Sequence, residues 1–166
     1  MNISIINLTH GLVSDQEMQT VIRALNRQVA EDFGPYWNLY GHLRLEGYSG
    51  GEPRKGENTE DMRGDAVIYI WDEADVPDAL GYHDANNQGV PFGFVFIDIA
   101  REMGENWTVT FSHEVLELLG DRQANLLVQG PHPSRPDHLV SLSPNFLVVL
   151  LVDSSSLKGS ISSENV

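Results

Sequence analysis

The residues best suited to chemistry lie in one short segment, Thr108 to Asp121, with the sequence TVTFSHEVLELLGD. Within it, His113, Glu114 and Glu117 form the pattern His-Glu-x-x-Glu. On an α-helix, His113 and Glu117 would share one face, because side chains four residues apart are separated by only about 40°. An imidazole and a carboxylate on one face of a rigid helix can bind a divalent metal such as zinc. Glu114 would lie about 100° further round, near enough to take a proton from water at the metal without binding the metal.

The same pattern could also be the solvated face of a surface helix. The neighbouring residues favour a buried helix, because apolar side chains surround most of its circumference. These residues are Val109, Phe111, Val115, Leu116, Leu118 and Leu119. Charged side chains in a buried helix need partners, since desolvating an unpaired carboxylate is very unfavourable. A metal ion would be such a partner, so the segment predicts a metal site.

The composition limits what else the chain can be. Its 166 residues, 41% of them hydrophobic, predict one soluble domain over residues 1–152 and a serine-rich, flexible tail over 153–166. The absence of cysteine excludes disulfides, thiol nucleophiles and thiolate metal ligands. A formal net charge of −14 argues against nucleic-acid binding. With no basic leader sequence and no apolar run of about 20 residues, the chain is expected to be cytoplasmic and not membrane-bound.

Several elements are predicted to position the motif helix. A strand at residues 3–8 leads to a helix that begins with a capping box formed by Ser14 and Glu17 and ends at Gly34-Pro35. Three further strands are predicted, at residues 37–45, 66–71 and 92–99. The segments 48–64, 72–89 and 131–137 are predicted as loops. Short strands are predicted at residues 125–128 and 146–152.

This order of elements and the motif together resemble the zincin metallopeptidases, and in particular their metzincin-like upper subdomain. There a twisted mixed sheet is followed by an active-site helix that carries His-Glu-x-x-His-x-x-Gly. The matching residues are His113, Glu114, Glu117 and Gly120. The resemblance implies an α+β fold, with His113 as a metal ligand, Glu114 as the general base and Glu117 as a ligand in place of the second histidine. A looser similarity is to uncharacterised bacterial and phage proteins that contain Ser-His-Glu-Val-Leu-Glu.

The third metal ligand departs from the family pattern. The family's third ligand would fall on Gln123, a poor zinc ligand, and no methionine follows Met103 to form the family's methionine turn. Asp121 is the nearest candidate. His132 and His138 are alternatives in or beside the proline-rich segment 131–137.

The remaining histidines have less specific interpretations. His10 and His42 are expected to be turn or strand-face residues. His83, next to Asp84, could line the cleft and polarise a carbonyl group, but an ordinary surface pair with Asp84 is the simpler expectation.

The sequence therefore predicts a small zinc-dependent hydrolase that acts on a peptide or amide bond of a peptide or protein substrate. The strand at residues 92–99 would form the edge of the cleft and could pair with an extended substrate. One alternative is a non-catalytic, metal-stabilised module, such as a phage or bacterial structural or interaction protein that kept the zincin fold. Another is a metal-free α/β domain in which Glu117 pairs with an arginine, the candidates being Arg101, Arg122 and Arg135.

Overall fold

The computed structural model describes residues 1–53, 59–77, 79–132 and 134–142. They fall into two compact units, Met1–Ala124 and Asn125–Val166, which are described separately. The domain bounds predicted from the sequence, 1–152, stay a prediction.

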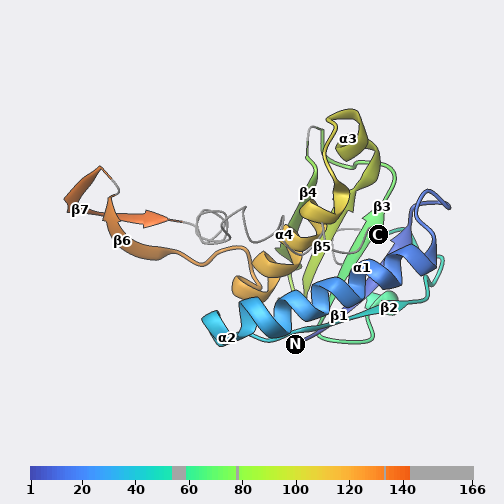
Figure 1. Ribbon diagram of the computed structural model, residues 1–166, viewed down its shortest axis with the longest axis horizontal. Coiled ribbons are helices and arrows are strands. Elements are labelled where there is room, and N and C mark those ends of the chain that lie inside the picture. The colour runs from blue at the N-terminus through green and yellow to red at the C-terminus, as the bar shows by residue number, and fades with distance from the viewer. Residues whose placement is uncertain (54–58, 78, 133, 143–166) are drawn as a thin grey trace, which may run out of the picture. The chain divides into compact units, whose positions relative to one another are not determined.

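The first unit is built on a five-stranded mixed sheet (Figure 1). Its strands are β1 (Asn2–Leu8), β2 (His42–Glu46), β3 (Ala66–Trp71), β4 (Gly81–Ala85) and β5 (Pro91–Phe96), in the order β2-β1-β3-β5-β4. All neighbouring pairs are parallel except β4 with β5, which is antiparallel. The mixed sheet with its helices confirms the predicted α+β class.

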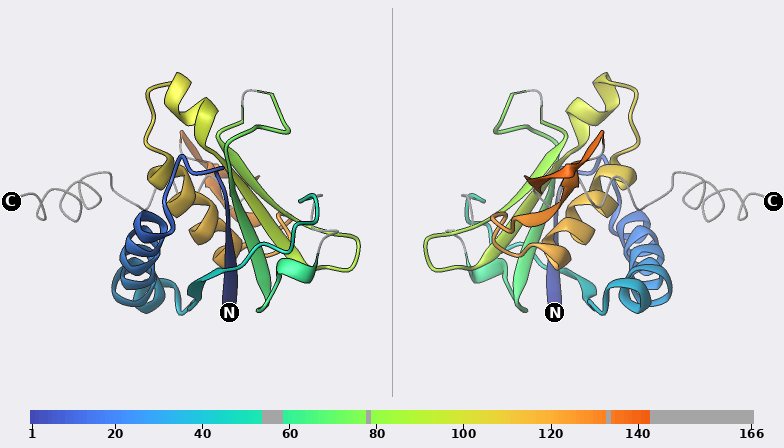
Figure 2. Two further views of the ribbon diagram at one scale, coloured as in Figure 1. Left: turned by 90° about the vertical axis from the view of Figure 1, so that its right-hand side faces the viewer. Right: turned by 90° about the vertical axis from the view of Figure 1, so that its left-hand side faces the viewer.

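The α-helices of this unit are α1 (Asp15–Gln28), α2 (Gly34–Trp37), α3 (Ile97–Glu102) and α4 (Trp107–Gly120). The helices α1, α2 and α4 lie on one face of this sheet, and α3 extends beyond the end of the strands (Figure 2). The predicted cap of α1 is confirmed, because Ser14 accepts a hydrogen bond from the Glu17 backbone at 3.2 Å. Asn106 caps α4 in the same way, accepting from the Thr108 backbone at 3.1 Å. Gly120 ends α4 as predicted.

The prediction that the first helix ends at Gly34-Pro35 is wrong. The chain passes through a π-helical turn, η1 (Val29–Phe33), and continues into α2 before Asn38 stops it in the left-handed conformation, with φ of 55°. Pro35 falls in the first turn of α2. Proline lacks a backbone N–H and disturbs a continuous helix, and the π-helical turn just before it is a local irregularity of the kind that accompanies such a disturbance.

The face opposite the helices carries an aromatic core. Its buried members are Ile6, Leu8, Val67, Tyr69, Phe92, Phe94 and Phe96. The connection between β2 and β3 covers part of this face, since Met62 packs against the cluster and Asp61 is fully buried. Asp61 accepts hydrogen bonds from the Tyr69 hydroxyl at 3.1 Å and the Ser49 backbone at 2.6 Å. The prediction of an exposed loop over residues 48–64 is therefore wrong around η2 (Thr59–Asp61).

Three strand predictions also need correction. The segment 37–45 forms a strand only from His42, because Trp37 still belongs to α2. The strand predicted at 92–99 ends at Phe96, and Ile97 begins α3. The segment 72–89, predicted as irregular, contains β4. The strand at 66–71 is confirmed.

The second unit contains an antiparallel pair, β6 (Val128–His132) and β7 (Arg135–Leu142). The prediction that residues 131–137 form only loop is wrong, because both strands extend into this segment, with an irregularity between Pro131 and His132. The strand predicted at 125–128 begins only at Val128. The strand predicted at 146–152 and the tail at 153–166 lie outside the described residues. Among the helices described, none is long and apolar enough to cross a membrane.

Candidate metal centre

The motif helix α4 packs against β5 and β4, and this contact brings its acidic residues to the sheet. Most of the helix is buried, including Glu114 and Glu117, so the expected burial is confirmed. Gly81 on β4 permits the close approach. A Cβ atom there would lie 3.0 Å from Glu114 Oε1, 3.0 Å from Thr110 Cγ2 and 2.7 Å from the Phe94 carbonyl oxygen. Any larger residue at Gly81 would push α4 or its side chains away.

Three buried side chains meet between β4 and α4. His83 Nδ1 lies 3.4 Å from Glu114 Oε2 and 3.4 Å from Glu117 Oε2. The side chains of His83, Glu114 and Glu117 are only 2%, 6% and 4% exposed. Within the described part of the chain, these three residues are the one group of three or more His, Asp or Glu side chains close enough to share an ion.

The spacing of these atoms fits a divalent metal. Ligands that are each about 2.0–2.1 Å from a tetrahedral metal are about 3.4 Å from one another. Both distances from His83 to the carboxylates have this value, and all three ligand atoms lie within 4.8 Å of one another. The hydrogen bonding of the group is also incomplete. Three buried side-chain atoms make no well-formed hydrogen bond to the described residues: His83 Nε2, Glu114 Oε2 and Glu117 Oε1. The two carboxylate oxygens do lie near imidazole nitrogens. Buried polar atoms of this kind call for an explanation, and an ion is one.

His113 lies at the outer side of the group. Its Nε2 is 3.1 Å from Glu117 Oε1, and its side chain is 37% exposed. Glu117 thus lies between two imidazoles, His83 on the sheet side and His113 on the outer side. The alternative in which Glu117 pairs with an arginine is wrong, since its partners are these two histidines.

The charges in the group stabilise one another. Burial alone lowers the pKa of His83, but its contacts with Glu114 and Glu117 outweigh burial and raise the pKa to about 9. Contact with Glu117 likewise raises the pKa of His113. Burial alone raises the pKa of Glu117, but the two histidines lower it to about 2. Without a metal, a protonated His83 can therefore balance the buried carboxylates.

The other candidate ligands are Asp121, in the first unit, and His132 and His138, in the second. Asp121 is buried at the C-terminal end of α4, where its backbone N–H donates to the Glu117 carbonyl at 2.6 Å. It is not part of the group of three. His132 and His138 belong to the second unit, where His132 accepts from the Ser134 backbone and His138 pairs with Asp137.

The expectation of a surface pair between His83 and Asp84 is wrong, because His83 is buried. The signal that could have identified it is the alternation of β4. Tyr82 packs against the aromatic core, so His83, the next residue, must point to the helix-covered face. His83 pairs across the strands with Gly93, whose lack of a side chain leaves room beside the imidazole.

The prediction that the strand at 92–99 forms the cleft edge is also wrong. β5 is enclosed between β3 and β4, and β4 is the terminal strand of the sheet.

Comparison with known proteins adds little to this geometry. No family model matches the chain. No curated protein matches it either. One solved structure, described as the structure of a chaperone-substrate complex, aligns with a TM-score of 0.46 at 13% sequence identity. The alignment covers 86% of this chain and 30% of that one, so this chain spans under a third of its length.

Proposed function

We propose that the chain is a metal-dependent hydrolase of the zincin metallopeptidase type, which uses a divalent metal to hydrolyse a peptide or amide bond. The observation that carries the proposal is the buried group of His83, Glu114 and Glu117, whose contacts of 3.4 Å have the spacing of metal ligands. Two of the three come from the His-Glu-x-x-Glu helix that resembles the zincin active-site helix.

The geometry favours His83, Glu114 and Glu117 as the protein ligands. Two carboxylates and one imidazole suit zinc, manganese or iron(II). A bound metal would supply Lewis acidity, polarising a carbonyl group and activating water. His113, partly exposed and in contact with Glu117, is then placed to move a proton between solvent and the site.

The sequence-based assignment is the competing arrangement within the same function. It makes His113, Glu117 and Asp121 the ligands and Glu114 the general base. The two arrangements differ at Glu114, which is a ligand in one and a base in the other. Glu117 is a ligand in both.

The β4 strand offers a place for an extended substrate. It carries His83 and ends the sheet, so its outer edge can accept a further strand. A peptide added there would run beside the group of three. This arrangement supports a peptide substrate over a small amide.

A second candidate is a metal-stabilised module without catalysis, such as a structural or interaction protein. The burial of all three side chains favours it, because structural sites are closed to solvent whereas catalytic sites keep an open position. Turnover, or its absence, in a metal-loaded protein distinguishes this candidate from the hydrolase.

The first experiment measures metal content and metal-dependent stability. Protein purified without chelator is analysed for transition metals, and its melting is followed with added zinc, manganese or EDTA. The hydrolase proposal expects about one metal per chain and a melting temperature that falls in EDTA, since a metal bound only to the folded state stabilises it. Equal melting under all three conditions would end both metal-based candidates.

The second experiment compares Glu114→Gln with Glu117→Gln. If Glu114 is a ligand, both variants bind metal more weakly. If Glu114 is the base, Glu114→Gln keeps its metal while hydrolysis of a fluorogenic peptide mixture falls by about 10²–10⁴. Glu31→Gln, an exposed change on the same side of the sheet, is the control and should alter neither quantity. Full metal binding without turnover on any peptide would support the structural module.

A further inference from the structure

A second candidate ligand site lies in the middle of the sheet, away from the edge strand β4. A hollow of about 360 Å³ opens at the carboxyl end of β1 and the start of α1, lined by Leu8, His10, Val13, Asp15 and Tyr48 among others. A neighbouring hollow of about 260 Å³ shares Leu8, His10 and Tyr48 with it and extends towards the end of β3. The two together form a groove across the carboxyl ends of two adjacent parallel strands.

The topology explains why a groove lies there. From β1 the chain passes through α1, on one face of the sheet, to β2. From β2 it returns to β3 over the opposite face, where Met62 packs against the aromatic core (Figure 2). β1 and β3 are neighbours in the sheet, yet the connection that leaves β1 leads to β2 on one side, whereas the connection that leaves β3 leads to β4 and β5 on the other side. In open α/β sheets, ligands bind in the crevice created at such a point.

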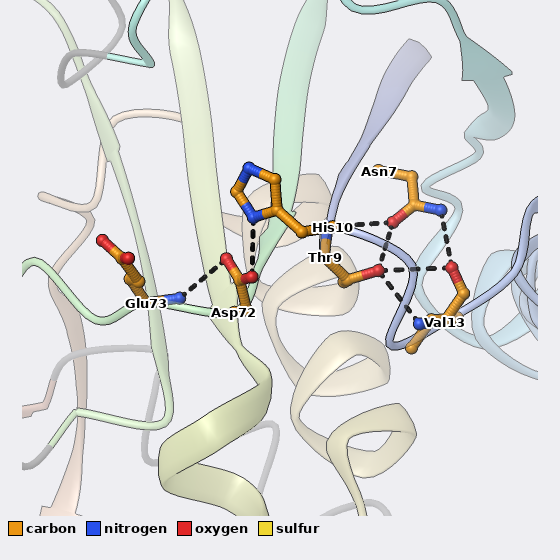
Figure 3. Close-up of polar contacts among 6 residues, drawn as sticks. All are labelled: Asn7, Thr9, His10, Val13, Asp72 and Glu73. Atoms are coloured by element: carbon orange, nitrogen blue, oxygen red, sulfur yellow. Dashed lines mark hydrogen bonds and ion pairs between the residues drawn. The ribbon is translucent and has the colours of Figure 1, made fainter.

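The loop that follows β1 is held rigidly (Figure 3). Thr9 is fully buried, and its hydroxyl donates to Asn7 Oδ1 at 2.8 Å and accepts from the Val13 backbone at 3.0 Å. The Asn7 amide in turn donates to the Val13 carbonyl and to Asp15 Oδ1, both at 2.9 Å. These bonds fix the backbone on both sides of His10.

His10 itself is presented to the groove in an unusual conformation. Its φ is 47°, in the left-handed region that residues other than glycine seldom adopt. Its side chain is 74% exposed, yet Nδ1 contacts Asp72 Oδ2 at 2.6 Å. Asp72 is held in place because its other oxygen accepts from the Glu73 backbone at 3.1 Å. Strain at an exposed histidine, combined with a fixed carboxylate that orients it, is typical of functional positions.

The contact with Asp72 determines what the imidazole can offer a ligand. A carboxylate only accepts hydrogen bonds, so Nδ1 carries a proton and Nε2 of the neutral ring is an acceptor. Figure 3 shows this second nitrogen pointing away from Asp72. A group that donates N–H therefore fits at Nε2 of the neutral His10 ring.

The charges around the groove favour the same kind of ligand. Asp15 lines the first hollow, and Glu52 and Glu73 line the second. None of the described residues that line either hollow is a lysine or an arginine. Tyr48 and Trp71 add aromatic rings, which attract cations as well as apolar groups. Phosphate is disfavoured, because Ser14 already caps the start of α1 and Asp15 and Glu17 make its first turn acidic.

We propose that this groove is a binding site for a small organic cation, an ammonium or guanidinium group on an apolar stem, with His10 Nε2 accepting one of its N–H groups. Asp15 and Glu73 supply the opposite charge, and Tyr48 and Trp71 contact the stem. The site uses none of the residues of the candidate metal centre. The result of testing this groove is therefore independent of the hydrolase proposal.

The test is a titration of the full chain, in EDTA, with agmatine, which carries a guanidinium and an ammonium on a four-carbon stem. Binding is followed through the imidazole nitrogen resonances of His10 in ¹⁵N-labelled protein, identified with a His10→Asn variant. Asparagine is chosen because it tolerates the left-handed conformation. Inorganic phosphate and AMP are titrated in parallel. We expect saturable shifts of His10 with agmatine below about 10 mM, and none with phosphate or AMP.

Two variants examine the residues involved, with thermal melting as the check on folding. His10→Asn and Glu73→Gln should each weaken agmatine binding by roughly tenfold, the effect of about 1.4 kcal/mol. The matched control Glu31→Gln, which changes an exposed carboxylate on the π-helical turn η1, should leave it unchanged. The proposal is overturned by absence of saturable binding, by binding of phosphate or AMP in place of agmatine, or by equal weakening in the control.

Discussion

Replacing His83 by glutamine is the change that most directly examines the buried group. Glutamine keeps a hydrogen-bonding side chain but cannot carry a positive charge. In the absence of metal, His83→Gln leaves Glu114 and Glu117 facing each other without the imidazolium that balances them. Both carboxylates are almost fully buried, so solvent cannot replace the lost charge. The remaining imidazole, His113, contacts only Glu117 of the two.

The expected decrease in the free energy of unfolding of His83→Gln can be estimated in two ways. The ligand atoms of the group lie within 4.8 Å of one another, and two unit charges at that distance repel by about 3 kcal/mol at an effective dielectric constant near 20. The carboxylates can avoid this repulsion by binding one proton. Protonating a carboxyl group whose ordinary pKa is 4.5 costs a similar amount at pH 7, about 3 kcal/mol. We therefore expect His83→Gln to lower the free energy of unfolding by about 3 kcal/mol, or the melting temperature by roughly 10 °C.

The effect should depend on pH in a defined direction. The raised pKa of His83, about 9, means that its stabilising charge is fully present below the ordinary value of 6.5 and is lost as pH rises through 9. The lowered pKa of Glu117, about 2, means that its contribution is present above 4.5 and is lost as pH falls towards 2. Both contributions are complete between pH 4.5 and 6.5, so the stability difference between the parent protein and the variant should be largest there and shrink on both sides.

The assay is urea unfolding in EDTA between pH 4.5 and 9.5, followed by circular dichroism. His42→Gln, which changes an exposed histidine on β2, is the control and should alter stability by no more than about 0.5 kcal/mol. A triple variant that also carries Glu114→Gln and Glu117→Gln should recover much of the loss, because replacing a whole buried charged group by neutral side chains is often nearly neutral. If His83→Gln is as stable as the parent protein at every pH, the inferred charge balance is wrong.

Three further predictions concern the rest of the chain. Burial and the contact with Asp61 raise the pKa of Tyr69. Spectrophotometric titration should therefore show Tyr69 ionising only when the protein unfolds, and the stability of the fold should decrease as pH rises above about 10. Ionisation of Tyr69 in the folded protein would contradict this. Gly81→Ala should lower the free energy of unfolding by about 1–3 kcal/mol and weaken metal binding, because the added methyl group would press on Glu114. Gly120→Ala should have neither effect, because the space around Gly120 is open. Truncation after Val152 should change the melting temperature by no more than about 2–4 °C, and a much larger drop would mean that the serine-rich tail is needed for the fold.

Local patterns predicted most of the individual elements. The N-cap at Ser14, the continuous apolar run of β3 and the buried α4 ending at Gly120 are all found as expected. Each depends on residues close together in the chain, where capping, period and side-chain volume act directly. The errors fall where such signals compete, as at Gly34-Pro35, where a π-helical turn keeps Pro35 in a helix despite the turn signal.

The pairing of the strands could not be predicted from local sequence patterns. β4 is short, contains Gly81, His83 and Asp84, and shows no run of β-branched residues. It is a strand because β5 offers it backbone hydrogen bonds from Pro91 to Val95. That pairing also encloses β5, and this moves the edge of the sheet from the predicted segment 92–99 to β4.

The acidic, cysteine-free chemistry available to the chain, and the position of Glu114 and Glu117 on one buried helix, follow from local patterns of residues. Which imidazole lies between the two carboxylates depends instead on how the strands and the helix pack together. His113 shares their helix, but the side chain in contact with both carboxylates is His83, which lies 31 residues before Glu114 on an edge strand. Helical spacing fixes neighbours within one element, whereas a contact between a strand and a helix depends on register, on the glycine that lets them approach, and on packing across the whole sheet.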